Sequence, residues 1–153
     1  MALLAAVLVL SAVALLGCGK DEPPLPLACR DADAAAFERA LRGAPRAVAL
    51  EDGTAISECL RRVRNDAQLQ NLGLVLSRVA DRLAVRARDA DDPAAAAQLG
   101  FLVGAARRGA ERSNGISSEL ARRLERAGLK LDGTRAALAD ALQTGLEAGQ
   151  ARG

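Results

Sequence analysis

The amino-acid sequence predicts an all-α fold, an antiparallel bundle of five or six helices. Its composition is the first reason, because half of the residues are hydrophobic, aromatic residues make up only 1%, and the abundant Ala, Leu and Arg are strong helix formers. The second reason is an apolar repeat with alternating spacings of three and four, which places its members on one helix face. The repeat comprises Leu69, Leu72, Leu76, Val79 and Leu83. The length of 153 residues allows a single domain.

The first two expected helices are short. Asp31 or Asp33 can cap a helix that runs to about Arg42, and Gly43 and Pro45 would end it. A brief extended run at 48–50 and a turn at 52–54 follow. The next helix would bury Ile56, Cys59, Leu60 and Val63.

The two central helices carry clearer signals. The leucine repeat predicts a helix from about Asp66 to Arg88, and Asp92 followed by Pro93 predicts the start of another, which runs to about Arg112. This second helix has apolar positions at Ala95, Leu99, Leu102, Val103 and Ala106. A stripe of small residues, Ala96, Gly100 and Gly104, would let a neighbouring backbone approach closely. Because each glycine costs about 1 kcal/mol of helix propensity relative to alanine, tight packing is expected to compensate.

The last two helices complete the bundle. Asn114 and Gly115 end the preceding helix, Ser117 or Ser118 caps the next, and Gly128 ends it. Its buried face is Ile116, Leu120 and Leu124. Thr134 is the expected cap of the final helix, and the residues after Glu147 are expected to fray. The buried face of that helix is Leu138, Ala141, Leu142 and Leu146.

An uncharged, almost wholly apolar segment of 15 residues, Ala2–Leu16, precedes the helical part. This is the length of a signal-peptide core, and it falls short of the about 20 residues that span a membrane. The segment ends in Leu15-Leu16-Gly17-Cys18, which resembles the lipobox of bacterial lipoproteins. The resemblance covers residues 1–18. It implies cleavage between Gly17 and Cys18 by signal peptidase II, a diacylglyceryl thioether on Cys18 and acylation of the new amine. Two or three acyl chains, of the palmitate type, would anchor the chain stably.

The resemblance gives an expected division of the chain into a signal peptide (1–17), a lipidated cysteine with an extended tether (18–28) and a helical domain (29–153). Pro23, Pro24 and Pro26 predict that the tether is not helical, and it would reach up to about 30 Å from the bilayer. In bacteria with two membranes, lipoproteins with Asp after the lipidated cysteine stay at the inner membrane. Here Gly19 occupies that position, which favours the outer membrane. The expected location is therefore outside the cytoplasm, at the bacterial cell membrane or outer membrane. A signal peptide normally begins with positive charge, and a start codon assigned too far downstream would explain the lack of it here.

Cys29 and Cys59 remain once Cys18 is assigned to lipid. They form an even pair in a compartment where disulfides persist, so we expect them to bond to each other. Two buried free thiols and a redox pair are the alternatives. The wide separation argues against a redox motif of the Cys-x-x-Cys kind.

The chemistry available to the chain is narrow. It contains no His, Trp or Tyr, which removes the commonest general base and the commonest transition-metal ligand. No glycine-rich phosphate loop lies between a strand and a helix, and a net charge of +2 without a basic stripe does not favour nucleic acid. We therefore expect a protein that is not an enzyme and has no cofactor.

Three groups of charged residues are candidate binding or catalytic sites. Asp89, Asp91 and Asp92 could in principle hold Ca²⁺, but the loop lacks the Gly and distal Glu of an EF-hand, so a helix cap without metal is expected. Glu119 and Glu125 are a conceivable carboxylate pair that nothing singles out from ordinary surface acids. The arginine pairs are candidate ligands for anions or else solvated helix faces, because neighbours on a helix diverge by ~100°. These pairs are Arg61-Arg62, Arg107-Arg108 and Arg122-Arg123.

Two functions remain open. The first is a membrane-anchored envelope lipoprotein whose domain binds another envelope protein or an anionic envelope component. The alternative is a small-ligand or lipid-binding module with an apolar cavity. A filled core with an exposed apolar patch would favour the first, and a cavity of roughly several hundred Å³ would favour the second.

Overall fold

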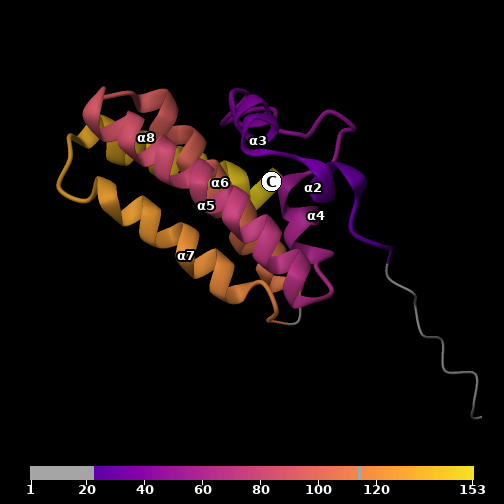
Figure 1. Cartoon of the computed structure of the whole chain (residues 1–153). Coiled ribbons are helices and arrows are strands. Elements are labelled where there is room, and N and C mark those ends of the chain that lie inside the picture. The colour runs from indigo at the N-terminus through magenta and orange to yellow at the C-terminus, as the bar shows by residue number, and fades with distance from the viewer. Residues whose placement is uncertain (1–22, 114) are drawn as a thin grey trace, which may run out of the picture.

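The computed structural model describes residues 23–113 and 115–153, and this part of the chain is an all-helical bundle without strands (Figure 1). The lipobox, Cys18 and the first residues of the expected tether lie outside the described residues. Within the described part, no helix has the length and apolar character needed to cross a membrane. The helices are α2 (Leu27–Asp31), α3 (Ala34–Leu41), α4 (Ile56–Arg61), α5 (Asp66–Asp89), α6 (Pro93–Glu111), α7 (Ser118–Gly128), the 3₁₀ helix η1 (Leu129–Leu131) and α8 (Ala136–Arg152).

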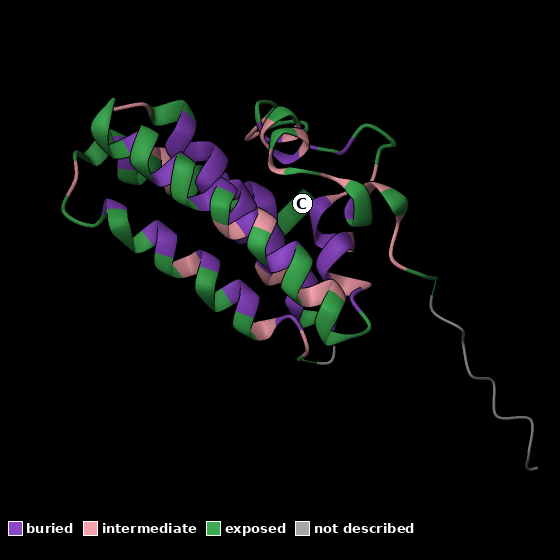
Figure 2. Ribbon diagram, in the orientation of Figure 1, coloured by how far each residue is buried: buried purple, intermediate pink, exposed green. Residues whose placement is uncertain are grey.

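The centre of the bundle is α6, which packs against α4, α5, α7 and α8. Most of its residues are buried, and its large apolar side chains belong to one hydrophobic core (Figure 2). The largest fully buried side chains include Phe37, Leu41, Ile56, Leu76, Leu99, Phe101 and Leu124. Four of the five residues in the leucine repeat of α5 are buried, and Leu69 is partly buried. The predicted all-α bundle is confirmed.

The closest helix pair is α6 with α8, and the two run parallel. Gly100 of α6 lies against the backbone at Leu142, and Gly104, one turn later, lies against the backbone at Leu146. In return, Gly145 and Gly149 of α8 lie against the α6 backbone. The predicted close approach at the small stripe of α6 is confirmed. Because α7 runs opposite to α6, and α8 runs opposite to α7, the helices α6 and α8 point in the same direction (Figure 1).

Two of the predicted helix caps, Asp33 and Asp92, are confirmed. Asp33 accepts the N–H of Ala36 at 2.8 Å, and Asp92 accepts the N–H groups of Ala94 and Ala95 at 2.9 and 3.2 Å. The helix after the turn is shorter than expected, since α4 ends at Arg61 and the buried Val63 follows it.

The expectation of an extended tether up to Ala28 is wrong at its end. The helix α2 begins at Leu27, because the Pro26 carbonyl accepts the N–H groups of Cys29 and Arg30 at 3.0 Å each. Proline restricts the residue itself and the one before it, and it is compatible with a helix that starts immediately afterwards. This extra element brings the described α-helices to seven instead of five or six.

Two expectations about the last helix are also wrong. Thr134 does not cap it, since the Thr134 hydroxyl donates to the Leu131 carbonyl at 2.6 Å and α8 begins at Ala136. The end of the chain does not fray after Glu147, because α8 continues to Arg152. The reason is tertiary: Arg108 donates to the Gln150 and Ala151 carbonyls at 2.8 and 2.5 Å.

Candidate functional site

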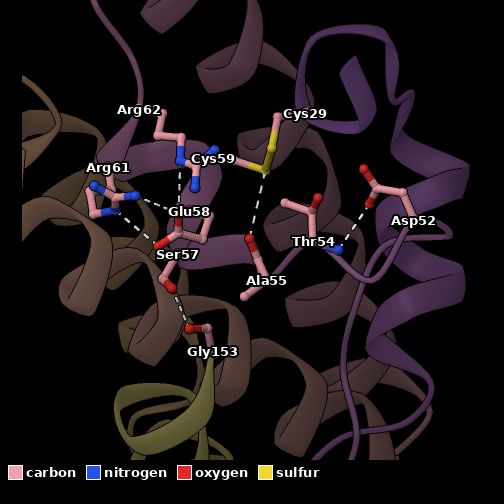
Figure 3. Close-up of a disulfide and its surroundings, with 10 residues drawn as sticks. All are labelled: Cys29, Asp52, Thr54, Ala55, Ser57, Glu58, Cys59, Arg61, Arg62 and Gly153. Atoms are coloured by element: carbon pink, nitrogen blue, oxygen red, sulfur yellow. Dashed lines mark hydrogen bonds and ion pairs between the residues drawn. A yellow bond between two sulfur atoms is a disulfide. The ribbon is translucent and has the colours of Figure 1, made fainter. Parts of the chain in front are cut away.

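The pair Cys29 and Cys59 forms a disulfide that joins α2 to α4 (Figure 3). The Cα atoms are 5.3 Å apart, and both cysteines are almost fully buried. Beside it, the Ser57 hydroxyl donates to the carbonyl of Gly153, which ties α4 to the end of α8. The disulfide therefore lies where the chain enters the domain, and it fixes α2 to α4.

The arginine pair Arg61-Arg62 converges on one carboxylate, that of Glu58 (Figure 3). The nitrogen to oxygen distances are 2.7 and 2.8 Å, and all three side chains are about one quarter exposed. The hydrogen bond from Arg61 is the largest cause that holds the pKa of Glu58 below its usual value, with the charges of both arginines acting in the same direction. The carboxylate is thus occupied within the protein, and this pair is not available to an anion.

Replacement of Glu58 tests this ion-pair cluster through its pH dependence. Because the folded protein lowers the Glu58 pKa, the stabilisation is present above the unfolded-state value near 4.3 and is lost as the pH falls through the folded-state value. Glu58→Gln should therefore lower the free energy of unfolding by about 1 kcal/mol at pH 7 and have little effect near pH 2. Urea denaturation at the two pH values measures this, with the exposed Glu111→Gln as control. A deficit that is equal at both pH values would contradict the assignment.

The aspartates of the loop between α5 and α6 form ion pairs with arginines. Asp92 caps α6 and pairs with Arg86 at 3.1 Å, Asp89 pairs with Arg88, and Asp91 pairs with Arg135. Among the described residues, no group of three or more acidic or cysteine side chains is arranged to hold a metal ion. These aspartates fix the junction of α5, α6 and α8.

The carboxylates of Glu119 and Glu125, both on α7, have different partners. Glu125 pairs with Arg107 of α6 at 2.7 Å, while Glu119 pairs with Arg122 and Arg126 on the outer face of α7. Arg108 points away from Arg107, towards α8. The arrangement gives no convergent acid pair and splits the second arginine pair.

The outer face of α7 carries a cluster of exposed basic residues. We define the α7 ridge as Arg122, Arg123, Arg126 and Lys130, which are all exposed. Three of them are spaced by four residues, so they follow one line along α7 and η1. Figures 1 and 2 show α7 at the edge of the bundle, with its inner side buried and its outer side open. Sequence reasoning missed this ridge because it considered adjacent arginines instead of this spacing.

Beside the ridge lies an apolar groove between α6, the end of α7 and α8. We define the α7–α8 groove, an open hollow of about 360 Å³, by its apolar side chains and its charged side chains. The apolar ones are Val103, Leu129, Leu142 and Leu146, and the charged ones are Arg107, Arg122, Arg126, Glu125 and Asp132. Leu129 is a large apolar residue that is nevertheless 61% exposed. The two outer arginines of the groove belong to the α7 ridge, so apolar and basic surfaces adjoin.

A smaller hollow of about 150 Å³ flanks α7 on its other side, against α5. Arg126 lines it together with Arg123, Lys130 and Ser77. The Ser77 hydroxyl oxygen is buried and has no hydrogen-bond partner within the described part of the chain. Lys130 pairs with Asp81 of α5 at 2.6 Å, whereas the guanidinium of Arg123 has no partner there. Both flanks of the ridge therefore offer hydrogen-bond donors.

The hollow near the start of the domain, about 470 Å³, is less suited to a ligand. Its charged side chains are already engaged: Asp33 caps α3, Asp31 pairs with Arg30, and Glu51 pairs with Arg39. The hydrogen bond from Arg30 is the main cause that lowers the pKa of Asp31. The surface around α7 is the better candidate site because it places several cationic groups, of which Arg123 has no partner among the described residues and Arg122 and Arg126 share one exposed carboxylate, beside apolar area.

Comparison of the chain with protein-family models, with curated proteins and with solved structures finds no match. Its function is therefore inferred from its own residues.

Proposed function

We propose that the chain is a lipid-anchored protein of a bacterial cell envelope, and that its helical domain binds another envelope component without catalysing a reaction. The observation that carries the proposal is the sequence Leu15-Leu16-Gly17-Cys18 at the end of an apolar segment. The thioether at Cys18 would hold the chain on the membrane, and the prolines that follow would act as a spacer.

The two remaining cysteines support the exported location. Cys29 and Cys59 are bonded, and disulfides persist outside the cytoplasm and are rare within it. Reduction inside the cytoplasm would remove the covalent link between α2 and α4.

The described surface supports binding over catalysis. Its acidic candidates, Glu119, Glu125 and Glu58, are each bound to arginine, which leaves them poorly placed to transfer protons. The core side chains are buried, and the three hollows described above are open to the surface, as is a fourth of about 430 Å³ between Glu38 of α3 and α5. A filled core with an apolar patch at Leu129 favours the interaction module over a ligand enclosed in the interior.

Metabolic labelling with palmitate tests the anchor. The wild-type chain should incorporate the label and sediment with membranes, and Cys18→Ala should lose the label, because Cys18 is the cysteine that follows the lipobox. The matched control is Cys29→Ala/Cys59→Ala, which keeps Cys18 and should keep the label. Undiminished labelling of Cys18→Ala would refute the proposal.

The same cells can test binding by the domain. A photoreactive amino acid in place of Arg123, on the α7 ridge, should give a reproducible adduct with an envelope component. The matched position is Arg64, which is also exposed and whose guanidinium has no partner within the described residues. Equal capture from both positions, or none from either, would count against the binding role.

A further inference from the structure

We propose that the α7 ridge and the α7–α8 groove bind one anionic, phosphate-bearing lipid, with the phosphate on the ridge and one acyl chain in the groove. The inference deepens the proposed function and rests on it, because the anchor is what keeps the domain beside a source of lipid. It names the envelope component as a lipid instead of a protein.

The apolar part of the site fits a chain. The groove volume of about 360 Å³ lies within the range of about 300–1,000 Å³ that is usual for small-molecule sites. Its wall at Leu129 is largely exposed, while Val103 at its base is buried. Covering Leu129, Leu142 and Leu146 with methylene groups removes apolar surface from water, which is favourable.

The walls of the groove are held by separate contacts and do not close on each other. On one side, Arg107 pairs with Glu125 and fixes α7 to α6. On the other side, Gly100 and Gly104 seat α8 directly on the α6 backbone. Since each wall packs on α6, an open hollow remains between them.

The charged part of the site fits a phosphate. Arg122 and Arg126 line the groove, and both are paired with the same exposed carboxylate, Glu119, at 3.0 and 3.5 Å. Exposed ion pairs of this kind contribute about 0–1 kcal/mol, so an incoming phosphate displaces the carboxylate at little cost. Guanidinium groups bind phosphate through paired hydrogen bonds. Arg123, which has no partner within the described residues, adds positive charge beside them, whereas Lys130 is paired with Asp81 and Asp132 adds one carboxylate to the groove.

The absence of Trp and Tyr from the sequence allows a fluorescence test without background. The full chain carrying Leu129→Trp is held in phosphatidylcholine nanodiscs and titrated with decyl phosphate below its aggregation concentration. The expected result is a saturable shift of the emission to shorter wavelength. Leu74→Trp is the matched control, because Leu74 is 64% exposed and lines none of the four hollows, and its emission should not shift. Circular dichroism checks that both variants keep their helices.

Charge variants in the Leu129→Trp background separate the head group from the chain. Arg122→Gln/Arg126→Gln should weaken the affinity for decyl phosphate about tenfold. Glu119→Gln should tighten it about threefold, because it removes the competing carboxylate. Neutral decanol should bind weakly and should not respond to either change. Inorganic phosphate should compete only at high concentration, since it lacks the chain.

Three results would overturn the inference. The first is an equal shift of the two tryptophan reporters, which would mean that the bilayer surface is what they sense. The second is an affinity for decyl phosphate that ignores the arginine and glutamate changes. The third is emission of Leu129→Trp that is already shifted before ligand is added and depends on protein density, which would mean that a second copy covers the groove. Failure of the palmitate labelling is a separate result and would refute the anchor alone.

Discussion

Gly100→Ala is expected to lower the free energy of unfolding by about 3 kcal/mol or more. An added Cβ would overlap the Leu142 carbonyl oxygen and lie 2.8 Å from the Leu146 nitrogen, and both are backbone atoms that no rotamer change can move. The helices would have to separate, and overpacking of a core typically costs about 1–3 kcal/mol and occasionally more. Urea denaturation followed by circular dichroism measures the change.

Gly73→Ala is the matched control and should have the opposite sign. Gly73 is also buried within a helix, but its Cβ would lie 3.6 Å from the Leu120 side chain, an ordinary contact. Alanine is a better helix former than glycine by about 1 kcal/mol, so this variant should gain up to that amount. If the two substitutions proved equally harmful, backbone crowding between α6 and α8 would not be the reason for Gly100.

The small stripe illustrates what the sequence can and cannot predict about the fold. Ala96, Gly100 and Gly104 predicted that some backbone comes close, and this is confirmed. The pattern identified neither α8 as the partner nor the parallel direction of the two helices. Gly145 and Gly149, which make the contact from α8, lie in a segment without a strong apolar repeat. A local period records which face is buried, while the partner is decided by packing across the whole domain.

The end of the chain shows the same limit. The residues after Glu147 include no large apolar side chain, and they were expected to fray. In the structure, Ala148 and Gly149 are buried because their small size lets α8 lie on α6. Small residues are weak evidence of burial when only hydrophobicity is counted, and strong evidence once a glycine stripe on another helix is taken into account.

The candidate site was foreseen in part. Arg122 and Arg123 were named from the sequence, and both belong to the α7 ridge. Of the other two arginine pairs, Arg61-Arg62 binds the partly buried Glu58 and Arg107-Arg108 contacts α7 and α8, whereas Arg122 pairs, within the described residues, only with the exposed Glu119 of its own helix. Adjacent charges on a helix point in different directions, so only tertiary contacts decide which of them remain free to bind a ligand.

Loss of the disulfide is the other change with a large expected effect. Cys29→Ala/Cys59→Ala should lower the free energy of unfolding by about 3–4 kcal/mol, since the bond closes a loop with a sequence separation of 30. For a domain of this size, the melting temperature should fall by roughly 10 °C. Thermal denaturation by circular dichroism measures it. Cys18→Ala, which lies before the helical domain, is the control and should leave the melting temperature unchanged.

Removal of the disulfide should also loosen the helices that it joins before the whole domain unfolds. With five residues, α2 is far too short to be stable as an isolated helix, so its position depends on Cys29 and on the few side chains around it. In the double variant, amide hydrogen exchange should therefore accelerate in α2 and α4 while α6 and α8, which pack on each other through glycine, remain protected. The reduced wild-type protein should reproduce this pattern. A melting temperature unaffected by either treatment would show that the helices around Cys29 and Cys59 hold the entry of the chain without the covalent bond.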